Sequence, residues 1–274
     1  MNHAVDMNHE ERLRFIESHE LADEQFDDVD APSVRVRRST LARAALDPSE
    51  DELRAAGAVV EGNIVAFTEG MARESKEDIM DSLLFASLVA NKAFNQKNHR
   101  VQWYAKYIEV LTVLGWISTN WNYEQVVSSS TRFTMEQAGL DIISSVLSAA
   151  TLPLTTAGAM IKVATDTVSA LKTSEKPLRL FERHARQNRG GSVRIVTCNE
   201  SQDGTVTVVV GAVSFETRSD VTNVLFWEWN KSDVETYKEG NGVVLNSRQY
   251  GTLRDAVQKK LSDRGIEAIE EFEI

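Results

Sequence analysis

The stretch HARQNRGGSVRIVTC, residues 184–198, contains the point at which the residue pattern of this chain changes. Before the Gly190-Gly191 pair, apolar residues recur three and four positions apart, which is typical of helices. After it they gather in short runs rich in valine, isoleucine and threonine, which is typical of strands. We therefore predict an α+β fold. A helical bundle with a hairpin fills the first two thirds, and a small antiparallel sheet with one covering helix follows.

Three regions are expected from this change of pattern. Residues 1–48 combine acidic and basic runs with little apolar periodicity, which indicates a charged tail that is mobile or bound to a partner. Residues 49–189 form the predicted helical region, which begins with a helix-like stretch to residue 72 that three glycines weaken. Residues 192–274 form the predicted β-rich region, with a hairpin near its start and a strand at 221–229. A small hairpin of strands 234–237 and 243–245, a helix at 247–263 and a final edge strand are expected to follow.

The composition argues against several classes of protein. A net charge of −11 disfavours nucleic acid as a partner, because nucleic-acid-binding surfaces gather lysine and arginine. The only cysteine, Cys198, permits no disulfide within the chain, which fits a reducing compartment. Residues 1–20 hold no apolar segment of the secretory type. We expect a protein that is cytoplasmic as synthesised, with release by a route independent of a signal peptide as the alternative.

The sequence carries none of the common signatures of catalysis or cofactor binding. It lacks a phosphate-binding loop, a dinucleotide fingerprint, a zinc-type His-Glu-x-x-His and a nucleophile elbow. We expect no cofactor and no metal, because His9 and His19 are widely spaced in a charged tail. Cys198 ends a predicted strand, and three interpretations stay open. It is a buried apolar residue, a nucleophile assisted by His99 or His184, or a lipidated thiol.

The stretch 142–161 has the most unusual composition in the chain, because it contains no charged residue. A helix that starts at Thr134 is interrupted by Pro153, so two antiparallel helices with a short connection are expected. Its other face consists of serine, threonine, alanine and glycine, too polar for a permanent transmembrane helix. Such a hairpin can pack in a core, pack against a partner or enter a bilayer. The residues expected on its apolar face are Ile142, Ile143, Val146, Leu147, Met160 and Ile161.

Two further groups of residues are candidates for binding. The first is an aromatic helix and its continuation, which we interpret as core, with a cofactor pocket or a membrane-interface belt as alternatives. The second is a basic helix that ends at Gly190-Gly191, which is either a solvated face or a site for an acidic segment or anionic lipid. The aromatic residues are Trp103, Tyr107, Trp116 and Trp121, and the basic residues are Arg179, Arg183, Arg186 and Arg189.

These patterns favour three hypotheses about function, in the following order. The first is a non-enzymatic, membrane-interacting, toxin-like protein, in which the aromatic helix covers a sheltered apolar hairpin. In general plan alone this resembles helical pore-forming toxins that hide such a hairpin. The second is a protein-interaction or self-assembly protein, in which the tail and the aromatic helix are buried on partner chains. The third is an enzyme with an unrecognised site around Cys198.

Overall fold

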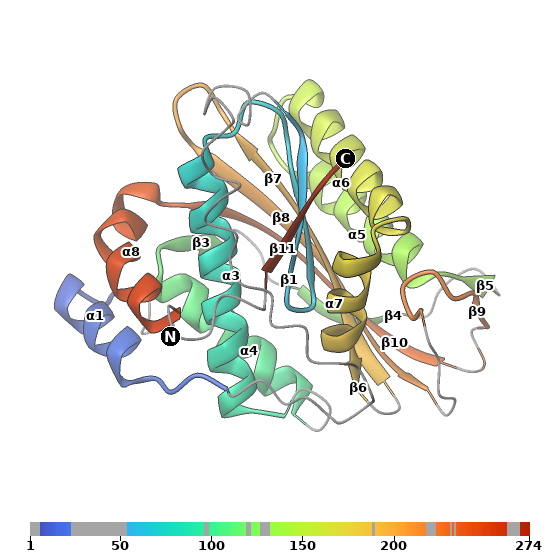
Figure 1. Ribbon diagram of the computed structural model, residues 1–274, viewed down its shortest axis with the longest axis horizontal. Helices are drawn as coiled ribbons and strands as arrows, with labels where there is room; N and C mark the ends of the chain where they lie inside the picture. Colours follow the sequence, from blue (N-terminus) through green and yellow to red (C-terminus); the bar gives the residue numbers. More distant parts are fainter. Residues whose placement is uncertain are drawn as a thin grey trace.

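The computed structural model describes residues 6–22, 54–95, 99–118, 122–126, 132–187, 190–217, 223–230, 232, 234–261 and 269–274. In this part of the chain a large β-sheet lies between two layers of helices (Figure 1). This architecture confirms the predicted α+β class. The sheet is larger than expected, and both of its faces are covered.

The main sheet draws its strands from the whole length of the chain. They are β1 (Ala56–Val60), β2 (Asn63–Phe67), β3 (Trp116–Ser118), β4 (Asn122–Val126), β6 (Arg186–Gln187), β7 (Gly190–Glu200), β8 (Val206–Thr217), β10 (Val234–Leu245) and β11 (Ile269–Glu273). Their order is β11-β1-β2-β7-β8-β10-β3, while β4 also pairs with β10 and β6 with β7. Among these pairs only β2 and β7 are parallel, so the sheet is mixed. A separate pair joins β5 (Arg132–Phe133) and β9 (Trp229–Asn230).

Each helical layer packs on its own face of the sheet. Side chains alternate along a strand, so Val208 and Val210 of β8 belong to one core, whereas Val209 and Val213 belong to the other. The first layer contains α1 (His9–Ser18), α3 (Arg73–Ala93), α4 (Arg100–Val113) and α8 (Ser247–Leu261). The second layer contains α5 (Met135–Ala149), α6 (Leu154–Leu171) and α7 (Glu175–Ala185).

The prediction of a helix between residues 49 and 72 is wrong. In the described part of that stretch, β1 and β2 form a hairpin. Layers cover both faces of these strands, so they are apolar at nearly every position and show no alternation. Glu61 and Gly62 form the turn, in which Glu61 has a φ of 49°. Pattern alone does not separate such a doubly buried strand from a helix.

Other expected boundaries also differ. The break at Gly190-Gly191 does not divide helices from strands, because β1 to β4 precede it and join the same sheet. The aromatic helix ends at Val113, and its expected continuation is β3. The two short strands expected between 234 and 245 are one long strand, β10. In the expected strand from 221 to 229, the described residues form turns that lead into β9.

The predicted tail contains a docked helix. Arg12 of α1 is 7 % exposed and donates from Nη1 to the carbonyl oxygens of Val113, at 2.5 Å, and Thr112, at 3.1 Å. A helix leaves its last carbonyls without helical partners, and Arg12 supplies a side-chain donor to this end of α4. This part of residues 1–48 is therefore held on the first layer, contrary to the expectation. Most of residues 23–48 lie outside the described residues.

Candidate functional site

The uncharged hairpin predicted around residues 142–161 is present as α5 and α6. Thr134 caps α5, since its side chain accepts a hydrogen bond of 3.1 Å from the amide of Gln137. The last turn of α5 ends at Ala150, and Pro153 precedes α6 because its fixed φ suits a helix start. The two helices pack together with a short connection, as the sequence predicts.

The apolar side of the hairpin faces the sheet. Ile143, Leu147 and Met160 are buried, Ile142 is 8 % exposed, and Val146 and Ile161 are partly buried. All six predicted residues therefore belong to the second core or pack against it. The hairpin is sheltered by its own chain in this conformation.

Glycines allow α5 to approach the strands beneath it closely. A Cβ placed on Gly139 would lie 2.7 Å from Cδ1 of Ile195, and a Cβ on Gly240 would lie 2.7 Å from Cγ2 of Val146. Real Cβ atoms do not come this near to other heavy atoms, so any side chain here would push the helix outward. The sheet beneath α5 is thus shaped for backbone-to-backbone packing.

A hydrogen bond from the sheet holds α6. The buried hydroxyl of Thr197 in β7 donates to the carbonyl oxygen of Met160 at 2.8 Å. Met160 lies within α6, where the carbonyl already serves the helix, so this is an additional bond between layer and sheet. Breaking it on release would expose both groups to water, which limits its net contribution to about 1 kcal/mol.

The outer face of the hairpin is unusual for a surface helix, which normally carries charges on its solvent side. From Ile142 to Ile161 the exposed positions are small, hydroxyl-bearing or apolar. Leu154, at the start of α6, is 91 % exposed. The exposed residues of the stretch are Ser145, Ser148, Ala149, Ala150, Thr151, Pro153, Leu154, Thr155, Gly158 and Ala159.

The predicted aromatic residues belong to the opposite layer. Trp103 and Tyr107 lie on α4 with their rings stacked at 5.2 Å, and Trp116 lies in β3. All three are at most 2 % exposed, which confirms the interpretation as core and removes them from any surface belt. They do not cover the hairpin, contrary to the expectation, because the sheet separates the layers. Trp121 lies outside the described residues.

A buried arginine that sequence reasoning missed lies beside these rings. Arg194 of β7 is 3 % exposed, and its guanidinium carbon lies 4.8 Å from the ring centroid of Trp103 and 5.8 Å from that of Tyr107. Its Nε donates to Oδ1 of Asn63 at 2.8 Å. Burial raises the pKa of Tyr107, because the phenolate would lack water. An arginine within the apolar run of a strand was the available signal, and its contacts tie α4 to the sheet.

The predicted basic helix is α7, and it ends at Ala185 rather than Arg189. Arg179 and Arg183 are exposed on it, and Arg179 forms an ion pair with Glu175. Arg186 lies in β6, where only its backbone is described, and Arg189 lies outside the described residues. The exposed part of the basic cluster therefore consists of α7 side chains.

Cys198 is fully buried in the first core. Burial raises the pKa of the Cys198 thiol well above its ordinary value, which disfavours the reactive thiolate. In this conformation the thiol is shielded from both a substrate and a lipid donor. The two histidines considered as metal ligands have other neighbours. Nδ1 of His9 lies 3.4 Å from the hydroxyl of Thr252, and Nδ1 of His19 lies 2.7 Å from the carbonyl oxygen of Phe15.

The described residues contain neither a membrane-spanning helix nor a cluster of metal ligands. None of their helices is long and apolar enough to cross a membrane. None of their histidine, cysteine, aspartate and glutamate side chains gather in threes where a metal ion could bind.

Comparisons with known proteins identify no family. No protein-family model matches the sequence, and no curated protein matches it. A solved delta-endotoxin structure is similar with a TM-score of 0.41 and 12 % identity, covering 79 % of this chain and 91 % of that one. A structure of the Evf virulence factor has a TM-score of 0.33 and 10 % identity, covering 80 % and 87 %. Neither likeness is close enough to carry an argument about this chain.

Proposed function

We propose that this chain is a non-enzymatic, membrane-interacting, toxin-like protein whose α5–α6 hairpin leaves the sheet and enters a lipid bilayer. One observation carries the proposal. The hairpin is uncharged from Ile142 to Ile161, although half of this stretch faces solvent. An ordinary surface hairpin gains solubility from charges on its outer face, so their absence here calls for another use of that face.

The energetics allow such a transfer. The apolar face of the hairpin is buried against the sheet, and acyl chains would bury the same side chains after release. The outer face would bring hydroxyls and small residues into the hydrocarbon region, where charged groups would cost much more. The uncharged part of α6, residues 154–161, spans about 12 Å, so the tip of the released hairpin fits a shallow insertion.

A charge placed at the exposed start of α6 tests the proposal without disturbing the core. We expect the wild-type protein to release an entrapped dye from vesicles of phosphatidylcholine with phosphatidylserine. Leu154→Asp should slow release about tenfold or more, because the carboxylate would have to enter the bilayer. Since Leu154 is 91 % exposed, the variant should unfold at the temperature of the wild type.

The matched control is Val101→Asp on α4, in the opposite layer. Val101 is 59 % exposed, so the same kind of change is made on a surface that the proposal leaves in water. We expect its release rate to equal that of the wild type. Vesicles that stay intact with micromolar wild-type protein at both pH 7 and pH 5 would overturn the proposal. An equal decrease in the rate of dye release in Leu154→Asp and Val101→Asp would overturn it as well.

Self-assembly is the second candidate, and the exposed Leu154 favours it as well. In that case the uncharged face of the hairpin would meet a second copy of the chain. Light scattering after size exclusion should then show an oligomer that Leu154→Asp dissociates and Val101→Asp does not. A monomer at all concentrations would remove this candidate.

An enzyme built around Cys198 has the least support. Two cavities among the described residues lie away from Cys198, one of about 10 Å³ beside Tyr107 and Trp116 and an open groove of about 320 Å³ beside Trp227. The first has room for about one water molecule.

A further inference from the structure

A basic surface lies beside the hairpin in a chain that is acidic overall. Residues 172–187 contain five lysine or arginine residues and two glutamates, whereas the whole chain has a net charge of −11. On α7, Lys176, Arg179 and Arg183 follow one another at helical spacing and are exposed. The opposite side of α7, with Phe181 and Ala185, is buried in the second core, so the helix can present only its basic side.

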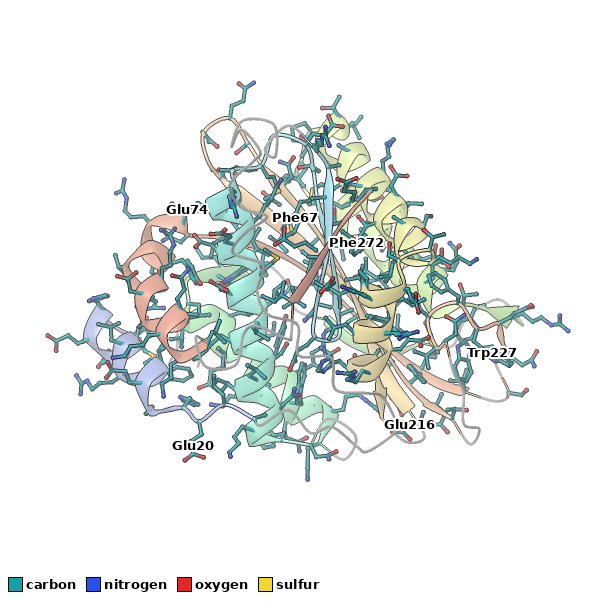
Figure 2. All side chains as sticks on the ribbon, in the orientation of Figure 1. Glu20, Phe67, Glu74, Glu216, Trp227 and Phe272 are labelled. Atoms are coloured by element: carbon teal, nitrogen blue, oxygen red, sulfur yellow. The ribbon has the colours of Figure 1, made fainter. Side chains whose placement is uncertain are left out.

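An exposed tryptophan follows a phenylalanine whose ring lies beside Lys172. Lys172, which follows α6, places its ammonium 5.3 Å from the ring centroid of Phe226. The next residue, Trp227, is 52 % exposed and lies at the outer edge of the molecule (Figure 2). Arg132 lines the same open groove as Trp227, where it forms an exposed ion pair with Glu228. Tryptophan prefers the boundary between water and lipid, because its ring is apolar and its N–H needs a polar partner.

These residues belong to the same side of the sheet as the hairpin. The described cores show α5, α6 and α7 together on one face, with Phe226 packed against the same core. Figure 1 shows this layer apart from α1, α3, α4 and α8. A planar surface that approached this side would meet basic side chains and an exposed aromatic ring beside an uncharged hairpin.

We propose that Lys172, Lys176, Arg179, Arg183 and Trp227 form a docking surface for anionic phospholipids. The inference rests on the proposed membrane function and names the lipid class that it uses. Lipid phosphates and carboxylates attract the cations of α7, and the acidic remainder of the chain is repelled, which fixes the orientation. The exposed pair of Arg179 with Glu175 is no obstacle, because such pairs contribute little and exchange readily.

Vesicle sedimentation tests the docking surface separately from dye release. The full chain is mixed with phosphatidylcholine vesicles, and with vesicles in which one fifth of the lipid is phosphatidylserine. We expect stronger binding to the anionic vesicles, which weakens as salt rises. The double variant Lys176→Glu with Arg179→Glu should lower binding to them about tenfold or more, since each basic residue near the surface contributes substantially.

The control carries the same change of charge on the opposite layer. Arg248→Glu with Lys259→Glu alters two exposed residues of α8 and gives the same net charge. We expect it to bind like the wild type. Trp227→Ala should weaken binding to both kinds of vesicle, with no change in salt dependence. The melting temperature of each variant, from circular dichroism, shows that the fold persists.

The outcomes separate the two proposals. Equal binding to neutral and anionic vesicles, or equal losses in the α7 and α8 variants, would overturn the docking surface. If the wild-type protein nevertheless released dye, and Leu154→Asp slowed that release, the hairpin proposal would stand. Binding that depends on phosphatidylserine and on α7, without dye release, would instead support docking and contradict hairpin entry.

Discussion

Gly139 of α5 lies directly on Gly211 of β8. A Cβ placed on Gly211 would lie 2.7 Å from the carbonyl oxygen of Gly139 and 2.9 Å from Cγ1 of Ile143. The helix backbone therefore contacts the strand without an intervening side chain. The proposed release of the hairpin requires this contact to break, so its strength should govern how readily the hairpin leaves.

Gly211→Ala should loosen the hairpin. The added methyl group has no room, and the overpacking should lower the free energy of unfolding by about 1–3 kcal/mol. Dye release should become faster, because the sheltered state is weakened while the surface of the hairpin is unchanged. Urea unfolding and release kinetics measure the two effects.

Gly158→Ala is the matched control within the same hairpin. A Cβ on Gly158 meets no atom within 4 Å, so alanine should stabilise α6 by up to about 1 kcal/mol. If Gly211→Ala proved as stable as the wild type, the close packing of α5 on β8 would be wrong.

A disulfide between α5 and β10 should lock the hairpin on the sheet. A Cβ on Gly240 would lie 2.7 Å from Cγ2 of Val146, so cysteines at these two positions bring their side chains together, and the bond would hold the helix against the local overpacking. Under oxidising conditions the double variant Val146→Cys with Gly240→Cys should release no dye, and a reductant should restore release. Each single variant serves as a control, and the buried Cys198 should not interfere. Equal release from the oxidised and reduced forms would contradict departure of α5.

Asp78 of α3 and Arg254 of α8 hold the other layer together. Arg254 donates from Nε and Nη2 to the two carboxylate oxygens of Asp78, at 2.7 Å each, and Asp78 is 2 % exposed. Asp78→Ala should lower the free energy of unfolding by about 2–4 kcal/mol, since it removes a buried partner. Binding to vesicles should be unaffected at a temperature where the variant is folded.

Glu74→Ala is the control for that ion pair. Glu74 contacts Arg254 at 2.6 Å, but its side chain is 71 % exposed, so its loss should cost less than about 1 kcal/mol. Chemical denaturation of both variants gives the comparison. Equal losses would show that burial does not set the strength of this pair.

Acid should destabilise the fold through His184 of α7. Burial, with the positive charges of Arg183 and Arg194, lowers the pKa of His184 to about 4 from its ordinary 6.5. A lowered pKa means that the folded state binds the proton less readily than the unfolded chain. The stabilisation is therefore complete above pH 6.5 and is lost as the pH falls towards 4, with a total of up to about 3 kcal/mol. His184→Gln should flatten the pH dependence of unfolding across this range. A profile unchanged by the substitution would refute this assignment.

The α5–α6 hairpin could be predicted from local residue patterns alone. The threonine cap at Thr134, the helical spacing from Ile142 to Met160 and the break at Pro153 all act within a few residues, and these features were sufficient to predict α5 and α6. The hairpin of β7 and β8 and the helix α8 were predicted for the same reason. Patterns also located the basic and aromatic groups without showing which face of the sheet each would occupy.

The position of each element on the sheet is set by packing between residues distant in sequence. The strands β1 and β2 show no alternation because both of their faces are buried, which no local signal reveals. The sequence could not show what Arg12 and Arg194 contact, because Arg12 binds a helix end about a hundred residues away and Arg194 lies against rings on another element. The residue pattern thus established an uncharged amphipathic hairpin, since side-chain periodicity is a local property. Only the folded sheet showed that this hairpin is sheltered by its own chain and which face of the sheet it shares with the basic helix, because both facts depend on contacts with strands distant in sequence.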